Sequence, residues 1–220
     1  MDRRAVNKAE SRLRAARKTL KRLERASNLQ DFADEWYQFL TTAKNVYTQI
    51  EKGSKSSAQS RQWFGSKKEF RRNDQLLQYM FQARDDDEHG LDLPVAIRPA
   101  QIEIGASGPN PSHYFRIDRA ATQNFVMENC IFGDSGEGAI KFIGDTPHDI
   151  RITSLDGGTV AVQHQAEAIE LKPVIGRGDV TYNPPTEHLG RHLVLRDPLF
   201  IAGLYLDYLD GLVGEAAKRA

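Results

Sequence analysis

Residues 29–50 read LQDFADEWYQFLTTAKNVYTQI, and the spacing of their apolar side chains predicts a long helix. These side chains recur every three or four residues, which places them on one helical face. They are Leu29, Phe32, Trp36, Phe39, Leu40, Ala43, Tyr47 and Ile50. A face this broad and aromatic implies that the helix is buried. Ser27 and Gln30, three residues apart, match a capping box, so we expect the helix to start there.

Three further segments carry helical patterns. Residues 6–25 form a charged helix with one narrow apolar stripe. Another helix carries Trp63 and Phe64, is expected to be interrupted near Gly65 and Ser66, and continues to the stop signals at Gly90 and Pro94. A final apolar helix follows residue 198 and must bury itself, most simply against the three N-terminal helices.

From about residue 97 the pattern changes to short β-branched or alternating runs, separated by clusters of Gly, Pro, Asn and Asp. These runs, among them residues 113–120 and 149–154, predict about six or seven antiparallel strands. We therefore expect an α+β protein, in which a helical bundle carries a β-rich antiparallel insertion. The expected parts are a helical part at 1–94, a β-rich module at 95–190, and a C-terminal helix within 191–220 that packs back on the helical part.

Composition excludes several classes of protein. No apolar run approaches the roughly 18 residues that a membrane span needs, and the N-terminal residues lack the apolar region of a secretory signal. We therefore expect a cytoplasmic protein without membrane partners. Cys130 is the single cysteine, so the chain forms no internal disulfide and no thiolate zinc cluster of its own.

The net charge of zero hides a strong asymmetry. Residues 1–72 hold 18 Lys and Arg against 8 Asp and Glu, whereas residues 73–220 hold 12 against 22. The first part of the chain is a candidate surface for a polyanion. The alternative is that the two parts attract each other, within the chain or between subunits.

Residues 79–92 read YMFQARDDDEHGLD, in which Arg84 and His89 bracket an acidic run. Five steps place these two side chains about 140° apart on a regular helix. They share a face only where the helix loosens or ends, and Gly90 favours an end there. The alternative role is structural: Arg84 and Glu88, four residues apart, form a surface ion pair, and the helix dipole favours a histidine in the last turn.

The run from Arg84 to His89 resembles the signature of the HEPN superfamily: an arginine, a polar residue, a few more positions and a histidine. Asp85 stands in the polar position. The resemblance implies a bundle of four or five helices with the motif late in a long helix. The β-rich residues, 97–190, depart from the minimal family pattern and lie outside the resemblance.

The resemblance also implies cleavage of RNA without a metal or other cofactor, by attack of the 2′-hydroxyl on the adjacent phosphate. Histidine, whose ordinary pKa is about 6.5, transfers protons near neutral pH, and the planar fork of arginine matches phosphate oxygens. We therefore expect the catalytic residues to be Arg84, Asp85 and His89, and the RNA-binding residues to be Lys67, Lys68, Arg71 and Arg72. The family further implies a composite site across a homodimer, and a role as a toxin or antiviral effector with an antitoxin or other protein partner.

A second hypothesis is a non-catalytic HEPN-like binding or scaffold protein whose β-rich module recognises a ligand or partner. The four consecutive acids count against the nuclease because carboxylates repel an RNA backbone, and they could instead bind a cation. Elsewhere, His188 and His192 have the four-residue spacing of helical metal ligands. Gly190 and the prolines before them favour a loop packed on the last helix, so we predict no metal site.

Overall fold

The computed structural model describes residues 1–89, 93–98, 101–107, 130–132, 140–143, 159–176, 178–195 and 197–220. For residues 87–89, 101–107, 130–132, 140–143 and 159–165 only the backbone is described. The chain forms two compact units, one of residues 1–96 with 169–220 and the other of residues 97–168.

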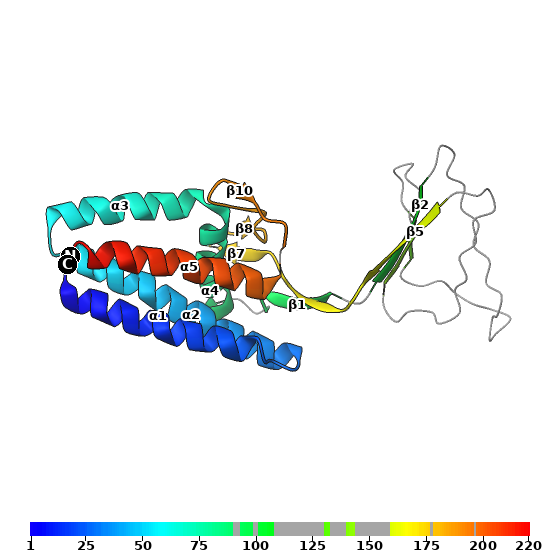
Figure 1. The fold of residues 1–220 in the computed structure, drawn as a ribbon, viewed down its shortest axis with the longest axis horizontal. Helices are drawn as coiled ribbons and strands as arrows, with labels where there is room; N and C mark the ends of the chain where they lie inside the picture. Colours follow the sequence, from blue (N-terminus) through cyan, green and yellow to red (C-terminus); the bar gives the residue numbers. More distant parts are fainter. Residues whose placement is uncertain are drawn as a thin grey trace. The chain divides into compact units, whose positions relative to one another are not determined.

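Five helices make up most of the first unit (Figure 1). They are α1 (Arg3–Leu23), α2 (Leu29–Ser54), α3 (Ala58–Asn73), α4 (Gln75–His89) and α5 (Pro198–Ala217). The cap of α2 is Asn28, whose side chain accepts a hydrogen bond from the Asp31 amide at 2.9 Å. The sequence predicted Ser27 for this position, one residue too early, because serine and asparagine cap helices about equally well.

The helix predicted around Trp63 is two helices. α3 runs through Gly65 and Ser66 without interruption, and the break falls at Asp74, whose backbone is extended with φ −95° and ψ 124°. The Asp74 carboxylate accepts a hydrogen bond from the Leu77 amide at 3.0 Å and so caps the start of α4. Four helices therefore precede the β-rich residues, where the sequence analysis predicted three.

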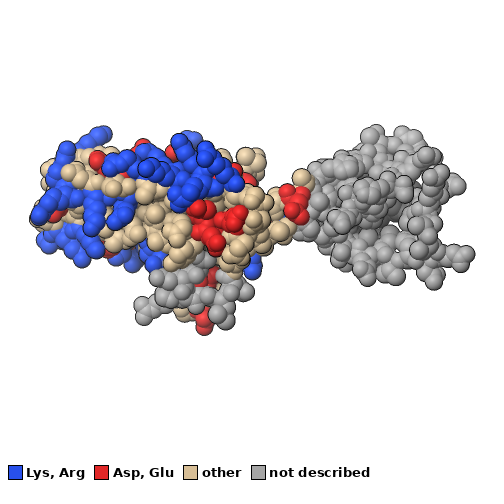
Figure 2. All heavy atoms as spheres, turned by 90° about the horizontal axis from the view of Figure 1, so that it is seen from below, with Lys and Arg blue, Asp and Glu red and all other residues tan. Residues whose placement is uncertain are grey.

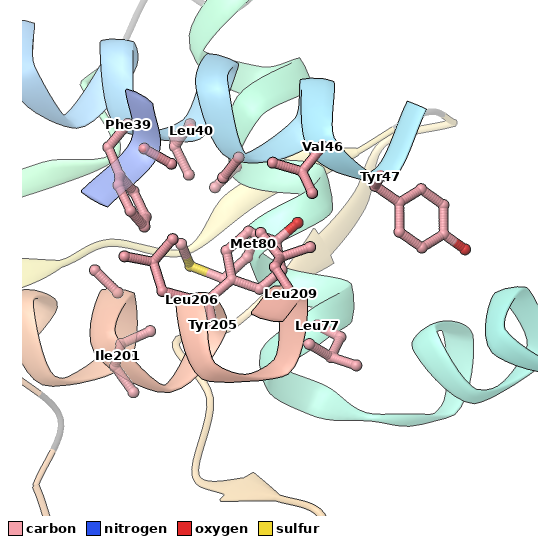
Figure 3. Packing of buried hydrophobic residues seen from close by; sticks show 14 of the residues in the cluster. Phe39, Leu40, Val46, Tyr47, Leu77, Met80, Ile201, Tyr205, Leu206 and Leu209 are labelled. Carbon is pink, nitrogen blue, oxygen red and sulfur yellow. The ribbon is translucent and has the colours of Figure 1, made fainter. Parts of the chain in front are cut away.

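The core of this unit is built around α2. Trp36, Phe39, Ala43 and Ile50 are fully buried, and the Trp36 and Phe39 rings lie 5.8 Å apart. Side chains of α4 and α5 converge on this face from the other side (Figure 3); they include Leu77, Met80, Ile201, Tyr205, Leu206 and Leu209. Burial of each large apolar side chain contributes about 1.5–3 kcal/mol, so this face of α2 contributes substantially to stability.

α1 packs along α2, and the two helices approach each other closely at Gly53. A Cβ placed on Gly53 would lie 2.6 Å from the Cβ of Ala5. The Asp2 amide also donates a hydrogen bond to the Gly53 carbonyl at 3.1 Å. A side chain at this position would therefore overlap α1.

Short strand pairs complete the first unit. β7 (Val174–Gly176) pairs with β8 (Val180–Tyr182), and β9 (Glu187–His188) with β10 (Arg191–His192), both antiparallel. β7 and β9 pack on α4. At the junctions with the second unit, β1 (Val95–Arg98) pairs with β6 (Ala168–Leu171).

The second unit contains a four-stranded antiparallel sheet in the order β3-β4-β2-β5. Its strands are β2 (Gln101–Ser107), β3 (Cys130–Phe132), β4 (Ile140–Ile143) and β5 (Thr159–Gln165). Together with the five helices, these strands confirm the predicted α+β class. The strands predicted at 113–120 and 149–154 lie outside the described residues.

Residues 169–190 belong to the helical unit, whereas the sequence analysis assigned them to the β-rich module. Contacts with α4 account for the difference: the Tyr79 hydroxyl donates to the Lys172 carbonyl at 2.7 Å, and the Thr186 amide donates to Gln75 Oε1 at 3.1 Å. Such contacts between distant residues leave no periodic signal in the sequence. Among the helices described, none is long and apolar enough to cross a bilayer.

We predict that Gly53→Ala lowers the free energy of unfolding by about 1–3 kcal/mol, because the new methyl group overlaps Ala5. Gly65→Ala is the matched control, since a Cβ at this helical position meets no atom within 4 Å. This control should raise stability by up to about 1 kcal/mol. Urea unfolding of both variants measures the difference, and equal effects would contradict the close approach of α1 and α2.

Candidate anion-binding site

Arg84 directly follows Ala83, which belongs to the buried face of α4. Leu76, Leu77, Met80 and Ala83 are at most 1% exposed, and they hold α4 against the core. The Arg84 side chain is only 21% exposed, and its Nη1 lies 3.2 Å from Asp85 Oδ1. The sequence motif therefore places its arginine at the margin of the core, where a guanidinium interacts with anions more strongly than in open solvent.

Lys44 of α2 reaches the same carboxylate. Its ammonium group donates to Asp85 Oδ1, and it also lies 4.7 Å from the centre of the Phe81 ring. The Lys44 and Asp85 side chains are 23% and 35% exposed. Lys44 and Arg84, from two different helices, thus contact the same carboxylate.

A pocket of about 170 Å³ opens beside these cations. Its lining consists of Arg84 from α4 and four residues of α2: Thr41, Lys44, Asn45 and Thr48. The four α2 residues fall on one helical face at the spacing i, i+3, i+4, i+7. All five side chains carry hydrogen-bond donors, and none is acidic.

Thr41 contributes a hydroxyl group to this lining. Its Oγ1 is buried and has no hydrogen-bond partner among the described residues. A buried polar atom without a partner is costly, and a bound anion or water molecule in the pocket would remove that cost. The pocket therefore combines two cations with hydroxyl and amide donors, which is the chemistry that recognises a phosphate or carboxylate group.

The four predicted RNA-binding residues lie in different surroundings. Arg71 is 7% exposed, and its guanidinium carbon lies 3.6 Å from the centre of the Phe81 ring, on which it stacks. Within the bundle, one face of the Arg71 guanidinium is therefore covered by the Phe81 ring. Arg71 thus lies inside the bundle and does not line the pocket.

The other three residues of that set are in ion pairs. Lys67 Nζ lies 2.7 Å from Glu215, Lys68 Nζ lies 3.6 Å from Glu51, and Arg72 Nη1 lies 4.0 Å from Glu69. The hydrogen bond from Lys67 holds the pKa of Glu215 below its ordinary value. None of the three lines the pocket.

His89 is the last residue of α4. Its side chain, like those of Asp87 and Glu88, lies outside the described residues. The structure therefore brings Arg84 together with Lys44 and Asp85, and the expected pairing of Arg84 with His89 stays a prediction.

His188 lies in a short strand, β9, and not in the predicted loop. The turn between β9 and β10 consists of Leu189 and Gly190, with φ of 53° and 71°. In the hairpin His188 pairs with Arg191, and His192 pairs with Glu187. Because paired residues share a face and neighbouring residues alternate, the His188 and His192 side chains project to opposite faces of the hairpin. Among the described residues, no group of three or more His, Cys, Asp or Glu could hold a metal ion. Instead, His188 is buried and its Nδ1 lies 3.0 Å from Asp74 Oδ1, the cap of α4.

Sequence reasoning missed the polar face of α2 and the pair of Asp74 with His188. The polar face can be recognised in the sequence, because Thr41, Lys44, Asn45 and Thr48 have helical spacing. The prediction of this helix considered only its apolar face. The pair of Asp74 with His188 left no signal, because 114 residues separate the two partners.

Comparison of the chain with family models, with curated proteins and with solved structures found no match.

The Asp74–His188 pair predicts an acid-sensitive fold. Burial alone would raise the pKa of Asp74, but hydrogen bonds from His188 and from the Leu189 and Leu77 amides outweigh it and lower that pKa. A carboxyl group with a lowered folded-state pKa stabilises the fold above the ordinary pKa of aspartate, about 3.9, and this stabilisation is lost as the pH falls through the folded value. Asp74→Asn should therefore cost about 1–3 kcal/mol of unfolding free energy at pH 6 and progressively less below pH 4.

Urea unfolding from pH 6 to pH 2 measures this convergence, with Asp207→Asn on the exposed side of α5 as the control. A constant difference between wild type and Asp74→Asn across that range would contradict the assignment of Asp74 as a charged cap.

Proposed function

We propose that this protein is a metal-independent endoribonuclease of the HEPN type, in which the pocket beside Arg84 binds the phosphate at the cleavage site. The observation that carries the proposal is that two partly buried cations, Arg84 and Lys44, meet at Asp85 and line a pocket whose side chains all carry hydrogen-bond donors. Because Arg84 also belongs to the arginine-to-histidine motif at the end of α4, the phosphate site and the motif coincide. The resemblance of the motif to the HEPN signature implies the type of reaction, and the pocket offers a binding site for the phosphate group of the substrate.

In the proposed reaction the 2′-hydroxyl oxygen attacks phosphorus, the new O2′–P bond forms and the P–O5′ bond breaks. A base removes the proton of the 2′-hydroxyl, and an acid returns a proton to the departing 5′-oxygen, so the step is balanced without a metal ion. His89 is the residue of the motif that transfers protons. Arg84 and Lys44 stabilise the negative charge that develops on the phosphoryl oxygens.

Asp85 has a positioning role in this proposal. Its carboxylate bonds both Lys44 and Arg84, so it holds two like charges side by side at the pocket. This pairing also answers the objection that the acidic run repels RNA, because at least Asp85 is neutralised by its neighbours. A second copy of the motif from a homodimer partner would complete a site with two histidines and two arginines, as the resemblance implies.

We predict that Arg84→Ala and His89→Ala each lower kcat/KM for cleavage of RNA by roughly 100-fold or more, the usual range for losing an oxyanion donor or a general acid–base. Lys44→Ala should act in the same direction, because it removes the second cation of the pocket. Lys52→Ala is the control, since this exposed lysine of α2 does not line the pocket. Purified full-length protein, assayed on RNA in the presence of a chelator, provides the measurement.

Expression in cells gives an independent readout, because an active ribonuclease used as a toxin or antiviral effector slows growth and degrades RNA. If wild type and the Arg84 and His89 variants leave RNA equally intact and growth equally fast, the ribonuclease proposal is wrong. Binding of inorganic phosphate by wild type but not by Lys44→Ala would then support a non-catalytic anion-binding protein.

A further inference from the structure

The exposed surface of α1 is strongly basic. Between Arg3 and Leu23 the helix holds nine Lys and Arg residues and one acidic residue, Glu10. Figure 2 shows Lys and Arg spread over much of one face of the helical unit, with a cluster of Asp and Glu toward one end. Repulsion among so many like charges costs stability unless the charges are paired or solvated, so their partners decide what this surface does.

Three of these cations are paired within the unit. Arg17 bonds Asp210 of α5 at 2.7 Å, Arg22 bonds Glu35 of α2 at 2.8 Å, and Arg4 lies 3.9 Å from Asp2. The first two lie at the edges where α1 meets its neighbouring helices. The ion pairs therefore accompany the packing of α1.

Four other cations form a stripe on the outer face of α1, here called the α1 stripe: Arg14, Lys18, Lys21 and Arg25. Their spacing of four, three and four residues aligns them along one side of the helix for about 16 Å. All four are exposed, and none is paired with a carboxylate in the part of the chain that the structure describes. Arg25 continues the stripe just beyond the last turn of α1.

The apolar face of α1 is not available to a ligand. Val6, Ala9, Leu13 and Ala16 are at most 3% exposed. No large apolar side chain of α1 is exposed, so the helix offers nothing to insert into a lipid bilayer. The stripe is a row of charges alone, which matches the regular row of phosphates along a nucleic acid strand.

We propose that the α1 stripe is a docking surface for the phosphate backbone of RNA. The inference rests on the proposed ribonuclease function and names its substrate class: a polymer that extends beyond the pocket, since none of the pocket residues lies on α1. The stripe contacts phosphates and carries no base-specific group, so it contributes affinity and orientation. Selection of the cleaved phosphate is left to the pocket.

The test uses full-length protein carrying His89→Ala, so that RNA stays intact, and a fluorescent 30-nucleotide RNA hairpin as the probe. Neutralising the stripe by Arg14→Gln, Lys18→Gln, Lys21→Gln and Arg25→Gln should weaken binding at least tenfold at 100 mM salt. It should also reduce the slope of log Kobs against log salt by about 3, because each lost phosphate contact removes roughly 0.7–0.9. The pairs Arg14→Gln with Lys18→Gln, and Lys21→Gln with Arg25→Gln, should each give about half of the change in slope.

The matched control neutralises four exposed cations elsewhere in the same unit, Lys52, Lys55, Arg61 and Lys218. It changes the net charge equally, so an equal loss of affinity in both quadruple variants would overturn the stripe as a specific surface. If neutralising the α1 stripe weakens binding to anionic phospholipid vesicles more than binding to RNA, the stripe is a membrane-binding surface and the RNA proposal is overturned.

Failure of the inference and failure of the proposed function give different results. With His89 intact, a stripe variant that cleaves the hairpin as fast as wild type, at RNA concentrations below KM, overturns the docking surface and leaves the ribonuclease standing. RNA that binds through the stripe but is never cleaved overturns the ribonuclease and leaves the docking surface standing. Cleavage of a dinucleotide should be unaffected by the stripe variants, because so short a substrate fills only the pocket.

Discussion

The packing of α4 and α5 on the aromatic face of α2 is the constraint on which the rest of the helical unit depends. Trp36, Phe39 and Ile50 are fully buried, and burying them fixes the rotation of α2 about its own axis. Once that rotation is fixed, the adjoining polar face must lie at the margin of the core. Thr41, Lys44, Asn45 and Thr48 are therefore positioned by side chains that never touch a ligand. The same packing holds α4, and with it Arg84, beside this polar face.

The pocket assembles two cations with little repulsion because each has a local partner. Asp85 bonds both Lys44 and Arg84, and the Phe81 ring lies beneath the ammonium of Lys44. Arg71 lies over the same ring at 3.6 Å, so one aromatic side chain contacts two cations from different helices. Cation–π contacts of this kind contribute about 0.5–2 kcal/mol each and are stronger where water is excluded. The positive charge at the pocket is thus built into the packing of α2, α3 and α4.

The sequence predicted the parts of this structure that depend on local spacing. The wide apolar face of α2 and the apolar helix after Pro198 follow from periodicity, and both helices are present. The break at Asp74 was missed because the residues on both sides continue a helical pattern, and the cap is completed by His188 from a distant hairpin. For the site, Arg84 and Asp85 could be singled out from the motif, whereas the spacing of Lys44 indicates only that it shares a polar helical face with Thr41, Asn45 and Thr48. The role of Lys44 depends on the alignment of α2 with α4, which only the tertiary packing determines.

Two explanations were given for the charge asymmetry of the chain: a surface for a polyanion, and attraction between its basic and acidic parts. They concern different residues. Arg17 with Asp210, and Lys67 with Glu215, join basic N-terminal helices to acidic positions of α5, so part of the asymmetry is attraction within the chain. The α1 stripe takes no part in this attraction, since its cations have no carboxylate partners among the described residues. Exposed ion pairs contribute only about 0–1 kcal/mol each, so pairing these cations would add little stability. Leaving them unpaired therefore costs the fold little and keeps a row of positive charge facing solvent, where a polyanion releases counterions on binding.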